Sequence, residues 1–410
     1  MKPSPFKHLF VLLPLCLQAQ FSIEKMDAPE SVGLSSFALS QMTDSLHLLV
    51  ENQQLAGIQT AVIREGKLVH FDSYGYANLE KQIPLNEQSI FRIFSMTKPL
   101  VSVALMQLYE KGLFQLEDPV SKFIPAFKNA KVYTENGLVP AAKPIQIIDL
   151  LTHSSGLNYG RSIPEELADY YRQANLYSAE DNQAFALKAA GLPLEFEPGS
   201  DWRYGISTTV IGYLIEVLSG QTLDQYLEEH ILSPLEMHDT HFQLPLSKVD
   251  RFTVGYRWSE QNGLFVSEDQ YNNRYTRKVT LFNGGGGLVS TSLDYLNFCQ
   301  MLLNGGRFKG KQLLQQSTVD LMLQDHLEEQ RNLQGRLRLP PHEYGFGLGF
   351  AVKDPGAPGG IYGWGGAVGT YFKIDTRSNM AYVMMIQLSP YRHLELRERF
   401  HHFVQAAIAE

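Results

Sequence analysis

Strand patterns lie at both ends of this 410-residue chain and helical patterns fill its middle, which leaves few ways to build a sheet. Two apolar runs in GIQTAVIREGKLVHFDSYGYAN, residues 57–78, flank an Arg64-Glu65-Gly66 turn and predict a β-hairpin. Near the other end, YGFGLGFAVK, GTYFKID and MAYVMMIQL are short aromatic or β-branched runs that predict further strands. A sheet built from both ends, with a helical region inserted between them, satisfies this order.

We therefore predict an α/β (α+β) fold in which an antiparallel sheet is flanked by helices. The sheet subdomain is predicted to comprise residues 21–98 and 281–410, and a mostly helical subdomain residues 99–280, together forming one domain. Outside the middle region, apolar residues at helical spacing predict helices over residues 35–52 (Phe37, Leu39, Met42, Leu46, Leu49), Leu293 to Leu303 and Leu394 to Ala407.

Composition and charge exclude several classes of partner. The chain is 44% hydrophobic and 19% charged, as in ordinary globular proteins, and its formal net charge is −8. An acidic surface offers no basic field to nucleic acid or anionic lipid, so neither is expected as a partner. No oligomeric state is predicted.

The first 20 residues have the pattern of a secretory signal. Lys2 and Lys7 precede a short apolar run from Leu9 to Leu17. This run is shorter than the roughly 20 residues that span a bilayer, so no integral membrane span is predicted. We expect residues 1–20 to be a signal peptide and the protein to be periplasmic or secreted; a chain that is not exported would be cytoplasmic. Cys299 would then be the one remaining cysteine, and it is interpreted as a buried apolar residue.

Ser95 and Lys98 begin a segment without any charge from Pro99 to Tyr109. Residues three apart on a helix share a face, and Pro99 requires the helix to begin close to Ser95. The Ser95 hydroxyl would lie at the positive end of the helix dipole, beside a lysine whose pKa desolvation would lower. Taken alone, the pair is also compatible with a helix cap and a lysine whose ammonium reaches solvent.

Two further stretches favour a chemical role. DWRYGISTTVIGYLIEVLSG places Tyr204 ahead of an amphipathic helix, and IYGWGGAVGTYFKID places Trp364-Gly365-Gly366 before a strand. With Ser95-x-x-Lys98 ahead of both, their order and spacing resemble the serine hydrolases of the β-lactamase and penicillin-recognising family. The supporting stretches are LEDPVSKFIPAF, LLTHSSGL, GGGGLVST and LSPLEMHDTHF. The resemblance spans roughly residues 28 to 408 and implies a β-lactamase-like fold.

Within this family the chain is most similar to the class C-like carboxylesterases and related acyltransferases. Lactamases and peptidases of this type carry Lys-Thr-Gly or a close variant where this chain has Trp364-Gly365-Gly366, so the cation for an anionic β-lactam is missing. Ile206 stands two residues after Tyr204, where class C lactamases carry Asn. The Ser-Asp-Asn motif of class A enzymes is absent.

The resemblance also implies a role for each site residue. Ser95 would be the nucleophile that forms an acyl-enzyme, and Lys98 and Tyr204 would accept its proton. The backbone N–H groups of Ser95 and Ala367 would bind the oxyanion. Around these catalytic groups, Gly365 and Gly366 would leave room for a small ester substrate, and Trp364 and Tyr362 would line its pocket. No cofactor and no metal are expected.

Other functions remain open at this point. A β-lactamase, a D-Ala-D-Ala peptidase or transpeptidase, an acyltransferase and a non-catalytic cell-wall-binding relative are the alternatives. An α/β-hydrolase would need a Gly-x-Ser-x-Gly elbow, which the chain lacks. His153 is interpreted as a hydrogen-bonded loop histidine, and His238 and His241 as surface residues, because no third metal ligand is near them in sequence.

Overall fold

The computed structural model describes residues 23–26, 28–267, 273–327, 344–353 and 360–409. The predicted secretory signal, residues 1–20, lies outside these ranges. Within them, no helix is both long enough and apolar enough to cross a bilayer.

A nine-stranded sheet forms the centre of the fold, in the order β1-β3-β2-β17-β16-β15-β14-β13 with β4 beside β3. All pairings are antiparallel except the short parallel pair of β1 with β3, so the sheet is mixed. The predicted sheet from both ends of the chain is thus confirmed. Its strands are β1 (Glu24–Lys25), β2 (Gly57–Arg64), β3 (Lys67–Asn78), β4 (Ile83–Pro84), β13 (Tyr344–Phe346), β14 (Ala351–Lys353), β15 (Ile361–Gly365), β16 (Tyr371–Asp375) and β17 (Met380–Met385).

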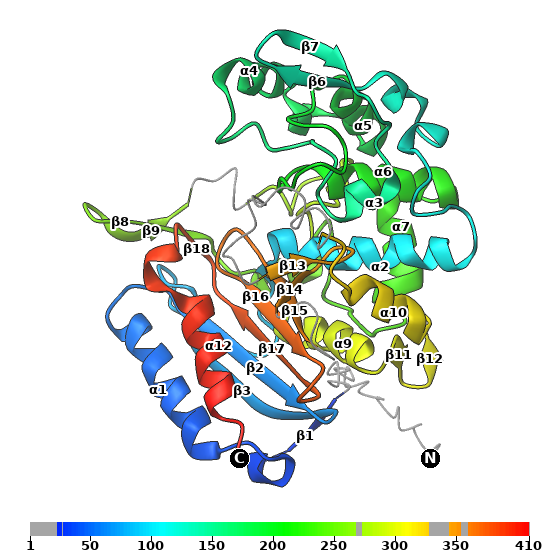
Figure 1. Ribbon diagram of the computed structural model, residues 1–410. Helices are drawn as coiled ribbons and strands as arrows, with labels where there is room; N and C mark the ends of the chain where they lie inside the picture. Colours follow the sequence, from blue (N-terminus) through cyan, green and yellow to red (C-terminus); the bar gives the residue numbers. More distant parts are fainter. Residues whose placement is uncertain (1–22, 27, 268–272, 328–343, 354–359, 410) are drawn as a thin grey trace, which may run out of the picture.

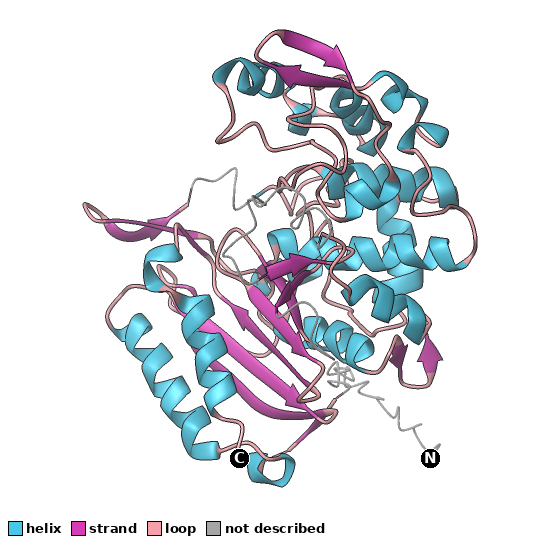
Figure 2. Cartoon of the chain, viewed as in Figure 1, coloured by secondary structure: helices cyan, strands magenta, loops and turns pink. Residues whose placement is uncertain are grey.

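Both faces of the sheet are covered, because apolar side chains alternate across it. In β17, Met380, Tyr382 and Met384 pack in one cluster, while Ala381, Val383 and Met385 pack in another. The first cluster lies under α1 (Ser36–Glu51) and α12 (Leu396–Ala406), which run side by side over one face (Figure 1). On the opposite face, α9 (Ser292–Leu303) packs against β17 and β2 (Figure 2).

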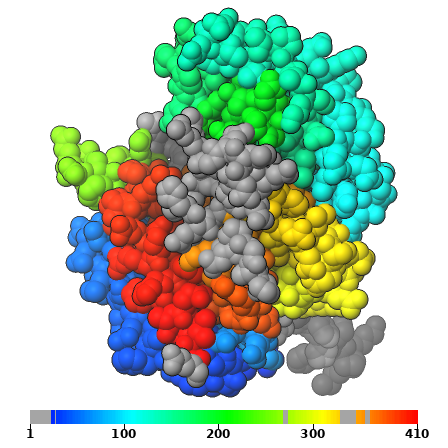
Figure 3. All heavy atoms as spheres, in the orientation of Figure 1, coloured from blue at the N-terminus to red at the C-terminus, as the bar shows by residue number. Residues whose placement is uncertain are grey.

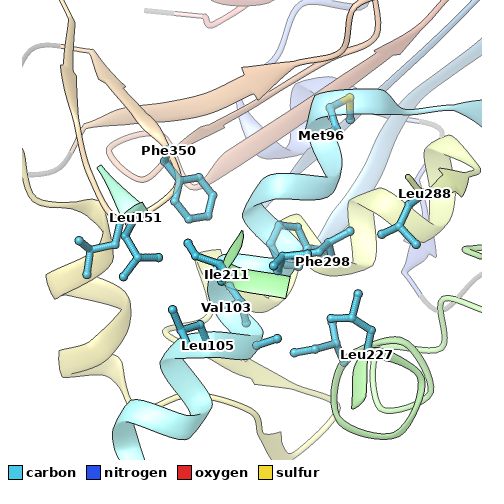
Figure 4. Close-up of a cluster of buried hydrophobic side chains, with 14 of the residues drawn as sticks. Met96, Val103, Leu105, Leu151, Ile211, Leu227, Leu288, Phe298 and Phe350 are labelled. Carbon is cyan, nitrogen blue, oxygen red and sulfur yellow. The ribbon is translucent and has the colours of Figure 1, made fainter. Parts of the chain in front are cut away.

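The rest of the chain forms a largely helical half, in which cyan residues gather away from the blue and red ends (Figure 3). Its central element is α2 (Thr97–Glu110), in which every residue from Thr97 to Leu108 is buried. Side chains of α2, α9 and neighbouring helices meet in one apolar cluster (Figure 4). The other α-helices are α3 (Ile147–Leu151), α4 (Glu165–Ala174), α5 (Asn182–Ala190), α6 (Ser207–Ser219), α7 (Leu223–Leu227) and α10 (Gln316–Leu323).

Single-turn helices and short strands complete the described chain. The 3₁₀ turns are η1 (Pro29–Val32), η2 (Phe94–Met96), η3 (Val120–Lys122), η4 (Pro125–Asn129), η5 (Leu176–Ser178), η7 (Leu246–Arg251) and η8 (Arg392–Leu394), and η6 (Glu228–Leu232) is a π-helical turn. The short strands are β5 (Phe91–Arg92), β6 (Lys131–Thr134), β7 (Gly137–Pro140), β8 (Tyr256–Ser259), β9 (Gly263–Val266), β10 (Val289–Ser290), β11 (Arg307–Phe308), β12 (Lys311–Gln312) and β18 (Leu388–Ser389).

Some local predictions were wrong or incomplete. The helical pattern predicted for the middle region omitted two hairpins, β6–β7 and β8–β9. YGFGLGFAVK is a hairpin of β13 and β14 rather than one strand. Phe37, one of the apolar residues at helical spacing in the first helix, is 71% exposed, unlike the other four. Cys299 is a buried free thiol in α9, as predicted. The subdomain boundaries stay predictions.

Candidate active site

Ser95 lies in η2, between β5 and the first turn of α2. The preceding residue, Phe94, has φ 44, a left-handed conformation that costs a non-glycine residue about 1–3 kcal/mol. Two hydrogen bonds fix this strained segment, from Ile93 N–H to the Leu288 carbonyl (3.2 Å) and from the Tyr295 hydroxyl to the Met96 carbonyl (2.8 Å). Ser95 itself is half-buried, so its hydroxyl is held in a defined place and remains partly accessible.

Lys98 is 2% exposed, and its ammonium is surrounded by oxygen atoms. Nζ donates to Ser95 Oγ at 3.3 Å, to Tyr159 Oη at 3.1 Å and to the Gly285 carbonyl at 2.5 Å. The carbonyl approaches this closely because Gly285 has no side chain: a Cβ there would lie 2.6 Å from Thr209 Oγ1. Three acceptors match the three donors of a lysine ammonium, which accounts for its burial.

Tyr159 is a site residue that the sequence reasoning missed. It follows LLTHSSGL in the chain, and its hydroxyl is within hydrogen-bond distance of Lys98, as described above. Burial, and then the neighbouring Tyr204, raise the pKa of Tyr159 well above its usual value of 10. Tyr159 is therefore a neutral phenol beside Lys98. Nothing in its spacing from Ser95 predicts this contact.

Tyr204 lies over the same ammonium, with Lys98 Nζ 4.7 Å from the centroid of its ring. Trp364 Nε1 donates a hydrogen bond of 3.1 Å to the Tyr204 hydroxyl. Within the described part of the chain, that hydroxyl forms no hydrogen bond with Ser95 Oγ or with Lys98 Nζ. Ser95 and Tyr204 thus both lie beside the Lys98 ammonium. Among these three predicted catalytic side chains, the hydrogen bond is between Ser95 and Lys98.

Aromatic rings enclose Tyr204. The ring of His153 is 4.9 Å away, that of Trp364 5.1 Å and that of Tyr159 5.5 Å. His153 is buried, and burial followed by the charge of Lys98 lowers its pKa well below 6.5. His153 lies in a turn and its carbonyl accepts from the Arg203 N–H at 2.9 Å, but its Nδ1 has no partner among the described residues. The neutral imidazole packs as a wall of the site.

Trp364 and Gly365 end strand β15 and also precede the next strand, β16, and Ala367 lies in the turn between the two. The turn is tied to the nucleophile segment, because Thr370 Oγ1 donates to the Ile93 carbonyl at 3.3 Å. The backbone N–H groups of Ser95 and Ala367 donate to no other residue that the structure describes. Both are thus available to an oxygen atom of a substrate.

The other predicted binding residues have different surroundings. Tyr362 is buried in the core, with its hydroxyl near Gly360 and Thr376 rather than near the groups around Ser95. A Cβ at Gly366 would lie 2.5 Å from the Ile93 carbonyl. In β15, Trp364 and Gly365 extend past the last residue paired with β14, so this part of the strand edge has no partner in β14.

Comparisons with known proteins identify a family and several similar proteins. A family model described as Beta-lactamase matches residues 42–406. Protein Rv1367c of Mycobacterium tuberculosis is 32% identical over 351 residues, covering 82% of this chain and 86% of its own length. Esterase EstB of Burkholderia gladioli is 25% identical over 383 residues, covering 87% and 92%. The solved structure of Simvastatin Synthase (LovD) from Aspergillus terreus superposes with a TM-score of 0.77 at 26% identity, covering 90% and 97%.

Proposed function

Since the chain belongs to the Beta-lactamase family, we propose that it is a serine hydrolase that acts as a carboxylesterase on small or short-chain esters. The predicted family and β-lactamase-like fold are confirmed; the activity is our proposal. The observation that carries it is the buried Lys98 ammonium hydrogen-bonded to Ser95 Oγ, together with the Ser95 and Ala367 N–H groups, which donate to no described residue. A merely structural lysine would have no need of a half-buried serine as one of its three acceptors.

In the proposed reaction, Ser95 Oγ attacks the ester carbonyl and forms a covalent acyl-enzyme while the alcohol leaves. The serine proton passes to the pair of Lys98 and Tyr204 and then to the leaving alkoxide. Water hydrolyses the acyl-enzyme in the second half of the cycle. The N–H groups of Ser95 and Ala367 would stabilise the negative oxygen in both halves, an effect typically worth about 3–4 kcal/mol per donor.

Tyr204 is the better proton acceptor of this pair. Lys98 has the arrangement of an ammonium that already donates three hydrogen bonds, so it has no free lone pair. The Tyr204 oxygen accepts the Trp364 N–H and donates no hydrogen bond to Lys98, and the Tyr204 ring lies beside the Lys98 ammonium. A hydrogen bond between Tyr204 and Ser95 Oγ must form when substrate binds, as is common for catalytic hydrogen bonds.

Trp364, near the end of β15, favours a neutral ester substrate over an anionic β-lactam. Trp364 presents an apolar ring and one N–H, and the N–H is used by Tyr204. A carboxylate would therefore meet no cation from this residue, whereas an ester needs none. The name of Esterase EstB describes such an activity in a relative. Export to the periplasm or the exterior is also proposed, on the sequence pattern of residues 1–20 alone.

A substrate panel with purified protein tests the proposal. We expect p-nitrophenyl acetate and butyrate to be hydrolysed, with little turnover of nitrocefin or of D-Ala-D-Ala peptides, and a fluorophosphonate to label one serine. Ser95→Ala should abolish hydrolysis and labelling with little change in stability. Ser102→Ala is the matched control, because Ser102 lies in α2, the helix that directly follows the Ser95 turn, and its Oγ has no hydrogen-bond partner among the described residues.

Each alternative function has its own outcome in this panel. Dominant turnover of nitrocefin would replace the esterase by a β-lactamase, and dominant cleavage of the peptides by a peptidase. An unlabelled wild-type protein would indicate a non-catalytic binder. Formation of a new ester when an alcohol is added would identify an acyltransferase, consistent with the synthase named in the LovD structure.

A further inference from the structure

Arg397, on α12, reaches across to the turn between β15 and β16. Its Nη2 donates to two carbonyl oxygens of this turn, that of Gly366 at 2.5 Å and that of Thr370 at 3.0 Å. The same turn is closed from within by hydrogen bonds from Gly366 N–H to Thr370 (2.8 Å) and from Gly369 N–H to Gly366 (3.2 Å). One guanidinium thus clamps both ends of the segment that carries Ala367.

The surroundings of Arg397 fit this single task. Its guanidinium lies 4.7 Å from the ring centroid of Tyr391 and 5.7 Å from that of Tyr371. It reaches the turn because residue 365 is glycine: a Cβ there would lie 2.3 Å from Arg397 Cζ. No described carboxylate is within salt-bridge distance of it. The charge is therefore directed at backbone carbonyls and is not neutralised by an acidic side chain.

The Gly366 carbonyl and the Ala367 N–H belong to one planar peptide group. In a trans peptide the two bonds point in opposite directions, so a donor that fixes the oxygen also fixes the direction of the N–H. A charged donor on the oxygen polarises the peptide and strengthens the N–H as a hydrogen-bond donor. We infer that Arg397 is a positioning residue of the oxyanion hole, acting on the Ala367 N–H through the Gly366–Ala367 peptide.

This inference rests on the proposed function, since it assigns a supporting group to the same oxyanion hole. It predicts a specific pattern of loss. Without Arg397 the Ala367 N–H is weaker and less well directed, which affects the tetrahedral state more than the bound ester. Loss of a whole oxyanion donor typically lowers kcat by about 100- to 1,000-fold, so loss of its support should cost about 10- to 100-fold.

The experiment compares Arg397→Met and Arg397→Lys with Arg399→Met as the matched control. Arg399 also lies on α12, two residues after Arg397, and donates to Ser45 Oγ at 3.0 Å rather than to the turn between β15 and β16. For each protein we would measure kcat and KM for p-nitrophenyl butyrate, the inhibition constant of butylboronic acid, which forms a tetrahedral adduct on an active serine, and the melting temperature. Arg397→Lys keeps charge and bulk, so it reports on the site even where Arg397→Met does not fold.

We expect kcat and boronate affinity to fall together, by about 10- to 100-fold in Arg397→Met and by less in Arg397→Lys, with KM nearly constant. Arg399→Met should match the wild type. Unchanged boronate affinity in a folded Arg397 variant would overturn the inference, as would equal losses in Arg399→Met. A wild-type protein that neither hydrolyses esters nor reacts with fluorophosphonate would instead overturn the proposed function.

Discussion

At the scale of single residues, the contacts of Lys98 explain how a buried cation is tolerated in the first turn of α2, just before the uncharged stretch from Pro99 to Tyr109. Its ammonium is compensated by three oxygens from three separate parts of the chain, Ser95, Tyr159 and Gly285. An ammonium buried without such partners would be costly, so the helix tolerates Lys98 only in this folded surrounding. The lysine and the serine are thus stabilised by the same set of contacts.

Trp364→Phe should lower kcat/KM. The Trp364 N–H donates to the Tyr204 hydroxyl and holds it in place beside Lys98, whereas a phenylalanine ring keeps much of the packing but cannot make this hydrogen bond. Loss of one such hydrogen bond should lower kcat/KM by about 2- to 10-fold. In both proteins kcat/KM should rise with pH, because the base must be deprotonated to accept the serine proton.

The measurement is kcat/KM between pH 5 and 9 with an activated ester. Trp202→Phe is the control, because Trp202 also faces the ring of Tyr204 at 6.3 Å but its Nε1 has no partner among the described residues. A profile that is flat in the wild type would contradict the Lys98–Tyr204 base. Equal losses of kcat/KM in both variants would show that ring packing, not the Trp364 N–H, holds Tyr204 in place.

The sequence predicted this site only as far as local geometry and family resemblance reach. Ser95 and Lys98 lie three residues apart at one helix start, and helical spacing alone places them together. Tyr159 and Arg397 reach the site through a loop and through a helix from the other end of the chain. Their positions depend on tertiary packing, which no spacing in the sequence encodes.

At the scale of elements, the predicted helices and strands with the strongest apolar periodicity were confirmed. Leu39, Met42, Leu46 and Leu49 of α1 are all buried. The two missed hairpins had a signal that the helical spacing obscured: each turn contains an Asn-Gly pair, Asn136-Gly137 and Asn262-Gly263. Both glycines have positive φ, as tight hairpin turns require.

Asp294, in the first turn of α9, should make stability depend on pH. Burial, and then the charge of Asp239, raise the pKa of Asp294 to about 7. The folded protein therefore keeps this proton up to about pH 7, whereas the unfolded chain releases it near pH 4. The contribution is fully present below pH 4, and it is lost as the pH rises from about 4 to 7, at up to roughly 1 kcal/mol per pH unit.

Asp294→Asn should remove this pH dependence, because an amide has no proton to lose in this pH range. The amide oxygen can still accept the hydrogen bond that the Asp239 N–H donates to Asp294 Oδ2 at 2.8 Å. We expect the melting temperature of the variant to gain on that of the wild type between pH 4.5 and 7.5. Asp169→Asn, at an exposed position, is the control. Parallel curves for wild type and Asp294→Asn would disprove the assignment.

At the scale of the whole molecule, α1 and α12 close one face of the sheet with residues from both ends of the chain. Phe400 of α12 is fully buried there, with its ring 5.5 Å from that of Tyr382 in β17. Phe400→Ala should lower the free energy of unfolding by about 3–5 kcal/mol, because the cavity it leaves lies between packed layers. Phe403→Ala, at a half-buried position of the same helix, should lower the free energy of unfolding by less. Urea unfolding of both variants measures the difference. Equal losses would mean that α12 is not anchored through Phe400.

The pairing of β2 with β17, in which Arg64 lies opposite Met380, also bears on how the protein is made. Because translation proceeds from the N-terminus to the C-terminus, β2 is synthesised long before β17. At 5–20 residues per second, about 300 further residues take on the order of 15–60 s. During that interval the nascent hairpin exposes an apolar edge that invites pairing with other chains. The sheet can therefore close only after nearly the whole chain has been synthesised.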